Sequence, residues 1–328
     1  MKKKQSANMK DVAALANVSI ATVSRFLNND LSRMSEETAE RVSESIDKLN
    51  YVPNSAARQM VTKSSNMIAV VVANIDDYFS TELFKGVSSI LESNGYIGVL
   101  FDTDTSQKRE IQLMDSVNNH SFDGLIFQPL TSDMNLIETE IRRDIPIVIV
   151  DREVERSSWP QVITNNYSAA RNAMLYFRNQ GYDHVIVISS DINIASTRRE
   201  RYQGITSVTD NVDVIEISEK SHNHKEIHDK IVSLIKKSDE KTLIFAIKER
   251  WLLEFMPGLI AKGYVDDKNV TATGFSDTDL ARAIEPQAKL IEQNPFLMGA
   301  SAAEVMIDLL KDDDKDIPSK LIIPAKLK

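Results

Sequence analysis

The chain has 328 residues, 42% hydrophobic and 27% charged, which is enough for two or three domains with sizeable cores. It has no cysteine, which excludes disulfides, thiolate nucleophiles and cysteine-ligated zinc or iron–sulfur sites. The formal net charge is -9, no apolar run approaches the ~18 residues of a membrane span, and the basic start lacks the apolar core of a secretory signal, so we expect a cytoplasmic protein without a membrane segment.

The overall acidity conceals a basic amino-terminal part. Residues 1–65 carry ten basic and seven acidic side chains, whereas the remaining residues carry 29 basic and 41 acidic ones. This asymmetry indicates that the two parts meet different partners. A polyanion such as DNA is the natural candidate for the basic part.

Three short helices are predicted in the basic part. The first is Asp11–Ala16, with Val12, Leu15 and Ala16 on one face. Asn17 is suited to a left-handed cap, and Ser19 is expected to cap the next helix, Ile20–Leu27. Ser35 is expected to cap the third helix, which ends before Pro53. Two short helices joined by a turn of three or four residues indicate a helix-turn-helix.

The pattern changes after Pro53. Asn54–Met60 is predicted to form a short helix, and Thr62–Asn66 is a polar linker. From Asn66 onward, apolar β-branched runs alternate with helical segments, which predicts parallel sheets with helices on both faces. The predicted strands are Ile68–Val72, Ile97–Phe101, Leu125–Phe127, Ile145–Val150, Val185–Ile188, Leu243–Ala246 and Val270–Ala272. The predicted helices are Thr81–Asn94, Lys108–Asn119, Asn166–Gln180 and Arg199–Val208. Two such α/β units of ~100 residues resemble sugar-binding domains with a cleft between them.

Several segments carry a resemblance to a known family. Met9–Asn28 reads MKDVAALANVSIATVSRFLN and closely matches the DNA-binding signature of the lactose/galactose repressor family. The match continues through Val42–Asn54 and Ala56–Arg58. In the body it includes Ile68–Val72, Phe122–Ile126, Val150–Arg152, Arg201–Gly204 and Gly274–Phe275. The resemblance covers nearly the whole chain.

This resemblance implies an α/β fold in three parts. Residues 1–53 would form the helix-turn-helix DNA-binding domain, and residues 54–65 the hinge helix and linker. Residues 66–328 would form a two-lobed, periplasmic-binding-protein-like body that binds the effector and dimerises. Lobe 1 would span about 66–163 plus 292–320, and lobe 2 about 164–291 plus the carboxyl-terminal segment.

The resemblance places the helix that starts at Ser19 in the major groove. Ile20 and Ala21 match base-reading positions and could contact a thymine methyl, whereas Arg25 can pair with guanine. Thr22, Ser24 and the backbone at Ser19 suit phosphate contacts. The resemblance implies these DNA-binding residues: Ser19, Ile20, Ala21, Thr22, Ser24, Arg25, Asn28, Tyr51, Asn54, Ala57 and Met60.

The segment 54–60 matches the hinge helix, which in this family folds when two subunits meet on the operator. Its last residue, Met60, stands where relatives place a leucine wedge in the minor groove, and a methionine can also unstack a base step. The alternative is that Met60 packs on the body.

The effector cleft implied by the resemblance departs from the family pattern. Lys248-Glu249 stands where an Asn-Asp pair is usual, and Ser276 where an acidic residue is usual. A lysine gained and a carboxylate lost both favour an anionic ligand. The effector-binding residues implied are Asp77, Tyr78, Phe79, Gln128, Asp151, Arg152, Arg201, Lys248 and Ser276. The segments 150–154 and 164–167 also resemble regulators of 2-keto-3-deoxygluconate use.

The other motifs of the sequence do not indicate metal binding, nucleotide binding or catalysis. His222, His224 and His228 have a spacing that could bind metal, but their polar, lysine-rich surroundings favour a solvated helix face. The sequence contains no G-x-G-x-x-G, G-x-x-x-x-G-K, G-x-S-x-G or H-E-x-x-H motif. We therefore expect no catalytic residue, no metal site and no cofactor.

Three functions are compatible with these features of the sequence. The first is a homodimeric repressor of carbohydrate genes that binds a pseudo-palindromic double-stranded operator and is released by a small ligand, an acidic sugar derivative or, alternatively, a neutral sugar. The second is a plain ligand-binding protein without a regulatory role, and the third is an enzyme. The helix-turn-helix motif favours the repressor. The chain ends just beyond Leu321–Pro324 without a long apolar heptad tail, so a dimer rather than a tetramer is expected.

Overall fold

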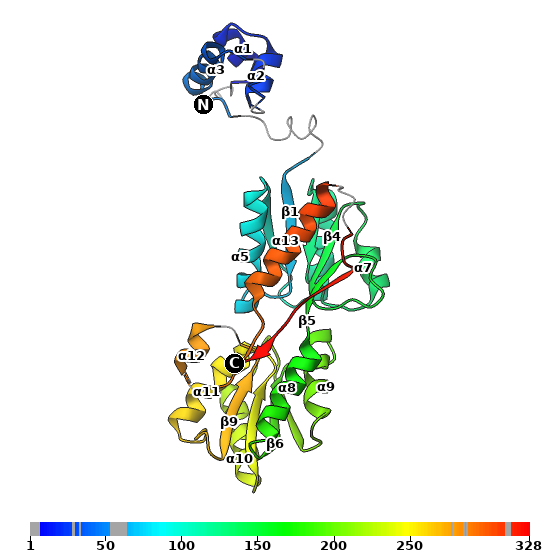
Figure 1. The fold of residues 1–328 in the computed structure, drawn as a ribbon, viewed down its shortest axis with the longest axis vertical. Helices are drawn as coiled ribbons and strands as arrows, with labels where there is room; N and C mark the ends of the chain where they lie inside the picture. Colours follow the sequence, from blue (N-terminus) through cyan, green and yellow to red (C-terminus); the bar gives the residue numbers. More distant parts are fainter. Residues whose placement is uncertain are drawn as a thin grey trace. The chain divides into compact units, whose positions relative to one another are not determined.

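The computed structural model describes residues 7–27, 30–32, 34–52, 64–276, 278–284, 286, 288–311 and 316–328. The chain forms two compact units, residues 1–65 and residues 66–328 (Figure 1). Pro53, the predicted hinge helix 54–60 and the first part of the linker lie outside the described residues.

The first unit contains the three predicted helices, α1 (Met9–Ala16), α2 (Ile20–Leu27) and α3 (Glu36–Leu49). Asn17 ends α1 in the left-handed conformation, with φ 54°, and Ser35 caps α3 by accepting from the Thr38 amide, so both predicted caps are confirmed. Of the three residues predicted to share a face of this helix, Val12 and Ala16 are buried, whereas the Leu15 side chain is 51% exposed. The core of this unit consists of Val12, Ala13, Ala16, Val23, Val42 and Tyr51.

The second unit begins with a lobe built on a six-stranded parallel sheet, in the order β11-β5-β4-β3-β1-β2. Its strands are β1 (Met67–Val72), β2 (Ile97–Asp102), β3 (Gly124–Phe127), β4 (Ile147–Asp151), β5 (Gln161–Thr164) and β11 (Lys320–Ile323). Helices α5 (Tyr78–Ser93) and α13 (Pro295–Lys311) pack on one face. Helices α6 (Gln107–Asn119) and α7 (Met134–Glu140) pack on the other.

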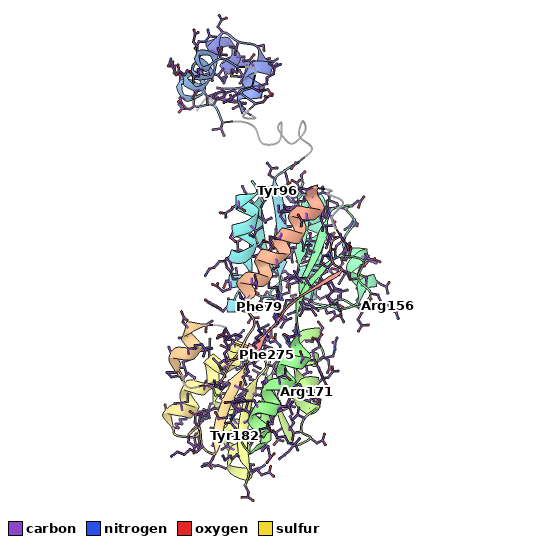
Figure 2. The ribbon with its side chains drawn as sticks, viewed as in Figure 1. Phe79, Tyr96, Arg156, Arg171, Tyr182 and Phe275 are labelled. Atoms are coloured by element: carbon purple, nitrogen blue, oxygen red, sulfur yellow. The ribbon has the colours of Figure 1, made fainter. Side chains whose placement is uncertain are left out.

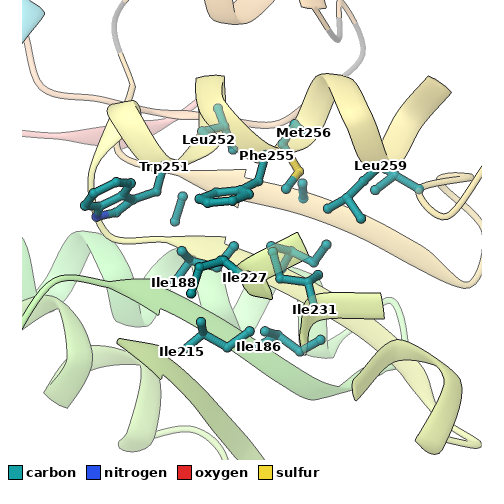
Figure 3. Packing of buried hydrophobic residues seen from close by; sticks show 14 of the residues in the cluster. Ile186, Ile188, Ile215, Ile227, Ile231, Trp251, Leu252, Phe255, Met256 and Leu259 are labelled. Carbon is teal, nitrogen blue, oxygen red and sulfur yellow. The ribbon is translucent and has the colours of Figure 1, made fainter. Parts of the chain in front are cut away.

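The other lobe has a four-stranded parallel sheet, in the order β7-β6-β8-β9. Its strands are β6 (Tyr182–Ser189), β7 (Val212–Glu216), β8 (Lys241–Ala246) and β9 (Val270–Gly274). Its helices are α8 (Asn166–Arg178), α9 (Ser196–Thr206), α10 (His224–Lys237), α11 (Glu249–Ala261) and α12 (Asp279–Ile284). Figure 3 shows Trp251, Phe255 and Leu259 of α11 packed over the isoleucines of β6, β7 and α10.

The chain passes between the lobes after β5, after β10 (Ile291–Glu292) and after β11. The last passage leads to β12 (Lys326–Leu327), which pairs with β10 in antiparallel fashion. Residues 321–323 were assigned to lobe 2 from the sequence, but β11 pairs with β5 in the first sheet, so this part of the assignment is wrong. Among the described residues, no helix combines the length and the apolar character that crossing a membrane requires.

Candidate functional site

Helix α2 exposes one face to solvent, and this face carries both apolar and charged side chains. Ile20, Ala21 and Arg25 are exposed on it, while Val23 on the opposite side is fully buried and anchors the helix to the core. The Ser19 hydroxyl accepts from the Thr22 amide at 3.1 Å, which confirms the predicted cap. An exposed, capped helix of this kind can enter the major groove with its first turns.

The other predicted DNA-binding residues have different positions. Thr22 and Ser24 are half-buried on α2. Tyr51 is only 8% exposed, because its ring belongs to the core of the first unit. Asn28, Asn54, Ala57 and Met60 lie outside the described residues.

A cavity of about 350 Å³ lies between the two lobes of the second unit. It forms where the parallel strands of both sheets reach their carboxyl ends, the usual place for ligands in open α/β sheets. The aromatic rings of Phe79 and Phe275 contribute to its walls, one from each lobe (Figure 2). All nine residues predicted from the resemblance line this cavity: Asp77, Tyr78, Phe79, Gln128, Asp151, Arg152, Arg201, Lys248 and Ser276.

Asp151 is held firmly at the end of β4. Its Oδ2 accepts a hydrogen bond of 2.7 Å from Gln128 Nε2, and Gln128 Oε1 in turn accepts from the Ala73 amide at 2.8 Å. Asp151 also has φ 65°, a left-handed conformation that costs free energy for a residue with a side chain. Local strain at a buried cavity wall is typical of functional sites.

Three buried arginines lie on the wall of the same cavity, and one of them, Arg198, is paired with the Glu219 carboxylate. Arg201 donates from Nε to Asn166 Oδ1 at 2.8 Å and from Nη1 to the Ile247 carbonyl at 2.7 Å, which fixes its plane. Arg152 donates from Nη1 to the Pro129 carbonyl at 3.2 Å, and its buried Nε has no hydrogen-bond partner among the described residues. Burial lowers the pKa of Arg152, whereas the charge of Asp151 opposes that shift.

The environments of Lys248 and Ser276 correct the charge argument made from the sequence. Lys248 Nζ lies 2.8 Å from Asp77 Oδ2 and 3.1 Å from Glu219 Oε1, so its charge is already balanced. Ser276 donates to the Glu249 carboxylate, which therefore restores an acid where the motif lacks one. The lining holds as many acidic as basic side chains, and its basic members are Arg152, Arg198, Arg201, Lys248 and Arg250.

Glu219, which sequence reasoning missed, lies behind this wall. Its Oε1 accepts from Ser190 Oγ at 2.7 Å, from Arg198 Nη2 and from Lys248 Nζ. Burial raises the pKa of Glu219, but the charges of Lys248 and Arg198 outweigh burial and lower it to about 2. Glu219 follows β7, a strand that the sequence did not predict, so no pattern placed it beside the cavity.

The histidine cluster is only in part the solvated face that was predicted, because His224 is exposed and His222 is half-buried, but His228 is buried. His228 is only 6% exposed, and His224 stacks on Phe255 with ring centroids 5.0 Å apart. His222 Nε2 lies 2.5 Å from Glu254 Oε1, and its Nδ1 faces the Ser218 carbonyl. Among the residues that the structure describes, no group of three or more potential ligands could hold a metal ion.

Comparison with known proteins decides the family. The model of "Bacterial regulatory proteins, lacI family" matches residues 8–54, and that of "Periplasmic binding protein domain" matches residues 68–314. A solved structure of a LacI transcriptional regulator from Lactobacillus brevis is 52% identical, with TM-score 0.76, over 80% of this chain and 99% of that one. The chain belongs to the LacI family of bacterial regulatory proteins.

Relatives of this LacI-family protein extend over its whole length. The HTH-type transcriptional regulator KdgR of Bacillus subtilis (strain 168) is 28% identical over 334 aligned residues, which cover 100% of this chain and 98% of KdgR. The lac repressor dimer bound to operator and the anti-inducer ONPF has the same fold, with TM-score 0.84 and 18% identity over 98% of both chains. This LacI-family protein is a DNA-binding transcriptional regulator.

Proposed function

We propose that this LacI-family regulator represses carbohydrate-utilisation genes and that a small acidic sugar derivative, bound between the lobes, releases it from operator DNA. The observation that carries the acidic ligand is that two of the three buried arginines of this cavity, Arg152 and Arg201, line it together with Asp151. A sugar acid offers both an anion for the arginines and hydroxyl donors for the carboxylate.

The chemistry of each group supports this assignment. A guanidinium matches a carboxylate with two parallel N–H donors, and such charge-assisted bonds are stronger than neutral ones. Asp151 can only accept hydrogen bonds when ionised, which suits sugar hydroxyls. The aromatic rings of Phe79 and Phe275 offer apolar faces to a sugar ring. A cavity of about 350 Å³ lies within the usual range for small-molecule sites.

Lys248 has a supporting role in the proposed binding of the acidic ligand. Its ammonium lines the cavity but is shared by Asp77 and Glu219, so it supplies positive charge to a ligand only by changing partners. We therefore assign the primary anion contact to Arg152 and Arg201, and a supporting one to Lys248. A 2-keto-3-deoxy sugar acid or a sugar phosphate fits this requirement, and a neutral sugar is the alternative.

For the DNA side, we propose a homodimer on a pseudo-palindromic operator, acting in the cytoplasm together with the DNA. Two copies of α2 would read two half-sites, with Arg25 on a guanine and Ile20 and Ala21 on thymine methyls. The exposure of Ile20, Ala21 and Arg25 on one helix face supports this assignment. The lac repressor, whose fold this chain shares, was solved as a dimer bound to operator.

Titration calorimetry on the full chain tests the proposed effector. Sugar acids, sugar phosphates and neutral sugars are first screened by thermal shift, because a ligand at 100 times its dissociation constant stabilises the folded state by ~2.7 kcal/mol. Each hit is then titrated beside the neutral sugar of matching carbon skeleton, on the wild type and on Arg152→Gln and Lys248→Ala. We expect the acid to bind more tightly than its neutral partner, Arg152→Gln to lose that preference and Lys248→Ala to reduce it. Tighter binding of the neutral sugar would refute the acidic effector.

A further inference from the structure

Charged side chains join the two lobes at the edge of the cavity. Asp77 precedes α5 in the first lobe, and Lys248 precedes α11 in the second. The Asp77 carboxylate makes no capping hydrogen bond to the amides of its own helix and instead lies 2.8 Å from Lys248 Nζ. Both side chains are largely buried, with 16% and 17% exposure, so this ion pair is screened much less than one on the surface.

Glu219 lies at the centre of the same group of contacts. Its Oε1 binds Lys248, Arg198 and Ser190, all from its own lobe. Its Oε2 accepts from Thr105 Oγ1 at 3.2 Å, and Thr105 follows β2 in the first lobe. One carboxylate therefore contacts the opposite lobe directly through Thr105 and indirectly through Lys248 and Asp77.

We infer that Glu219 is a positioning residue that holds Lys248 across the cleft, and that Asp77, Thr105, Glu219 and Lys248 form an interlobe latch that sets the arrangement of the lobes without ligand. Glu219 does not line the cavity, so its effect on the effector site acts through Lys248 and through the spacing of the lobes. The inference concerns the ligand-free protein and therefore goes beyond the proposed effector.

The charges explain why these contacts act as one unit. Lys248 lies between two carboxylates, and Glu219 lies between two cations. Removal of one member of such a buried group leaves its partners without a counter-charge, which costs more than the lost contact alone. Separation of the lobes then lowers the free energy of the ligand-free protein, because water can reach Asp77 and the remaining charges.

The absence of cysteine allows a direct measurement in the full chain. We would introduce cysteines at the exposed Lys108 on α6 and Lys225 on α10, attach nitroxide labels, and measure their distance distribution by pulsed electron paramagnetic resonance. Labelled chains would be mixed with excess unlabelled chains, so that distances within one chain dominate. No sugar is added, so the outcome does not depend on which effector the protein binds.

We expect one narrow distribution for the wild-type latch. Glu219→Gln and Lys248→Met should each shift it to longer distances and broaden it, and the double variant should shift it little further than either single one. The matched control is Lys230→Met, which removes an exposed ion pair with Glu226 on α10 and should leave the distribution unchanged.

An unchanged distribution in both Glu219→Gln and Lys248→Met, with thermal melts that confirm folding, would overturn the latch. A shift in Lys248→Met without one in Glu219→Gln would overturn the role of Glu219. If Glu219→Gln fails to fold, Glu219→Asp takes its place, since a shorter carboxylate cannot reach Lys248 and Thr105 together.

Discussion

The guanidinium carbon of Arg201 lies 3.7 Å from the centre of the Phe275 ring. Arg201 comes from α9 and Phe275 follows β9, so the stack joins two elements of the second lobe at the cavity wall. A cation over an aromatic face is attracted by the ring quadrupole, and the effect grows when both groups are desolvated. The stack and two hydrogen bonds therefore fix the orientation of the guanidinium at the cavity wall.

We predict that Arg201→Lys weakens effector binding by roughly 2 kcal/mol or more, which is on the order of 30-fold. Lysine keeps the charge but loses both the planar stack on Phe275 and the forked donors. Titration calorimetry with the hit from the sugar screen measures the change. Arg199→Lys, on the same helix but outside the cavity, should bind as the wild type does, and equal losses in both variants would contradict the assignment.

Helix α2 gives a prediction on operator reading. Arg25→Ala should weaken binding to the cognate operator by ~1–3 kcal/mol and relax discrimination at one base pair of each half-site. Fluorescence anisotropy with operator and random duplexes at fixed salt measures both effects. Arg41→Ala, on α3, should leave discrimination unchanged. Equal losses on cognate and random DNA would instead identify Arg25 as a phosphate contact.

We expect the buried Glu110 to make the free energy of unfolding depend on pH. Its side chain is fully buried on α6, and burial raises its pKa to about 7, with the nearby Glu140 adding to the shift and the amide of Leu130 opposing it. Between about pH 4.5 and pH 7, the folded state therefore holds a proton on Glu110 that the unfolded state has lost. The stability due to this group is therefore present below about pH 4.5 and is lost as the pH rises to about 7.

We expect Glu110→Gln to flatten this dependence. The wild type should lose up to roughly 3 kcal/mol of unfolding free energy between pH 5 and pH 8 through this group, and the variant should not. Urea denaturation across this range measures the difference, with the exposed Glu138→Gln on α7 as the control. Parallel pH curves for Glu110→Gln and the wild type would show that Glu110 stays ionised.

The crossing of α5 and α13 depends on two glycines. A Cβ at Gly299 would overlap the Leu83 carbonyl, and one at Gly86 would overlap the Phe296 carbonyl. Gly299→Ala should therefore destabilise the fold by ~1–3 kcal/mol or more, since the helices must separate. Gly258→Ala on α11 is the matched control, because its nearest neighbour would be His228 Cδ2 at 3.7 Å. That control should raise stability by up to about 1 kcal/mol in thermal melts, and a neutral Gly299→Ala would contradict the close crossing.

The periodicity of the sequence predicted the parallel sheets because their central strands are continuous apolar runs. It did not predict β7, where only Ile215 is buried and the run Val212–Glu216 is too polar to stand out. It also did not predict α13, which is buried over most of its length and has no clear polar face. Elements at sheet edges and wholly buried helices leave weak periodic signals.

The candidate site was predictable residue by residue but not in its charge balance. The resemblance named nine residues that all line the cavity. It could not pair Lys248 with Glu219 or Ser276 with Glu249, because these contacts join residues 29 and 27 positions apart, respectively, through the packing of the lobe. Charge counted along a motif therefore differs from charge in the cavity.

Release of operator DNA by an acidic sugar can be measured on the full chain. An operator is selected from a random duplex pool, labelled with a fluorophore and bound by the full chain, and anisotropy is followed as sugar is added. We predict that 2-keto-3-deoxygluconate lowers the anisotropy at concentrations where the neutral 2-deoxy-D-glucose has no effect, and that Arg152→Gln removes this response. Release by the neutral sugar at equal or lower concentration, or tighter DNA binding with the acid, would show that an acidic sugar is not the inducer.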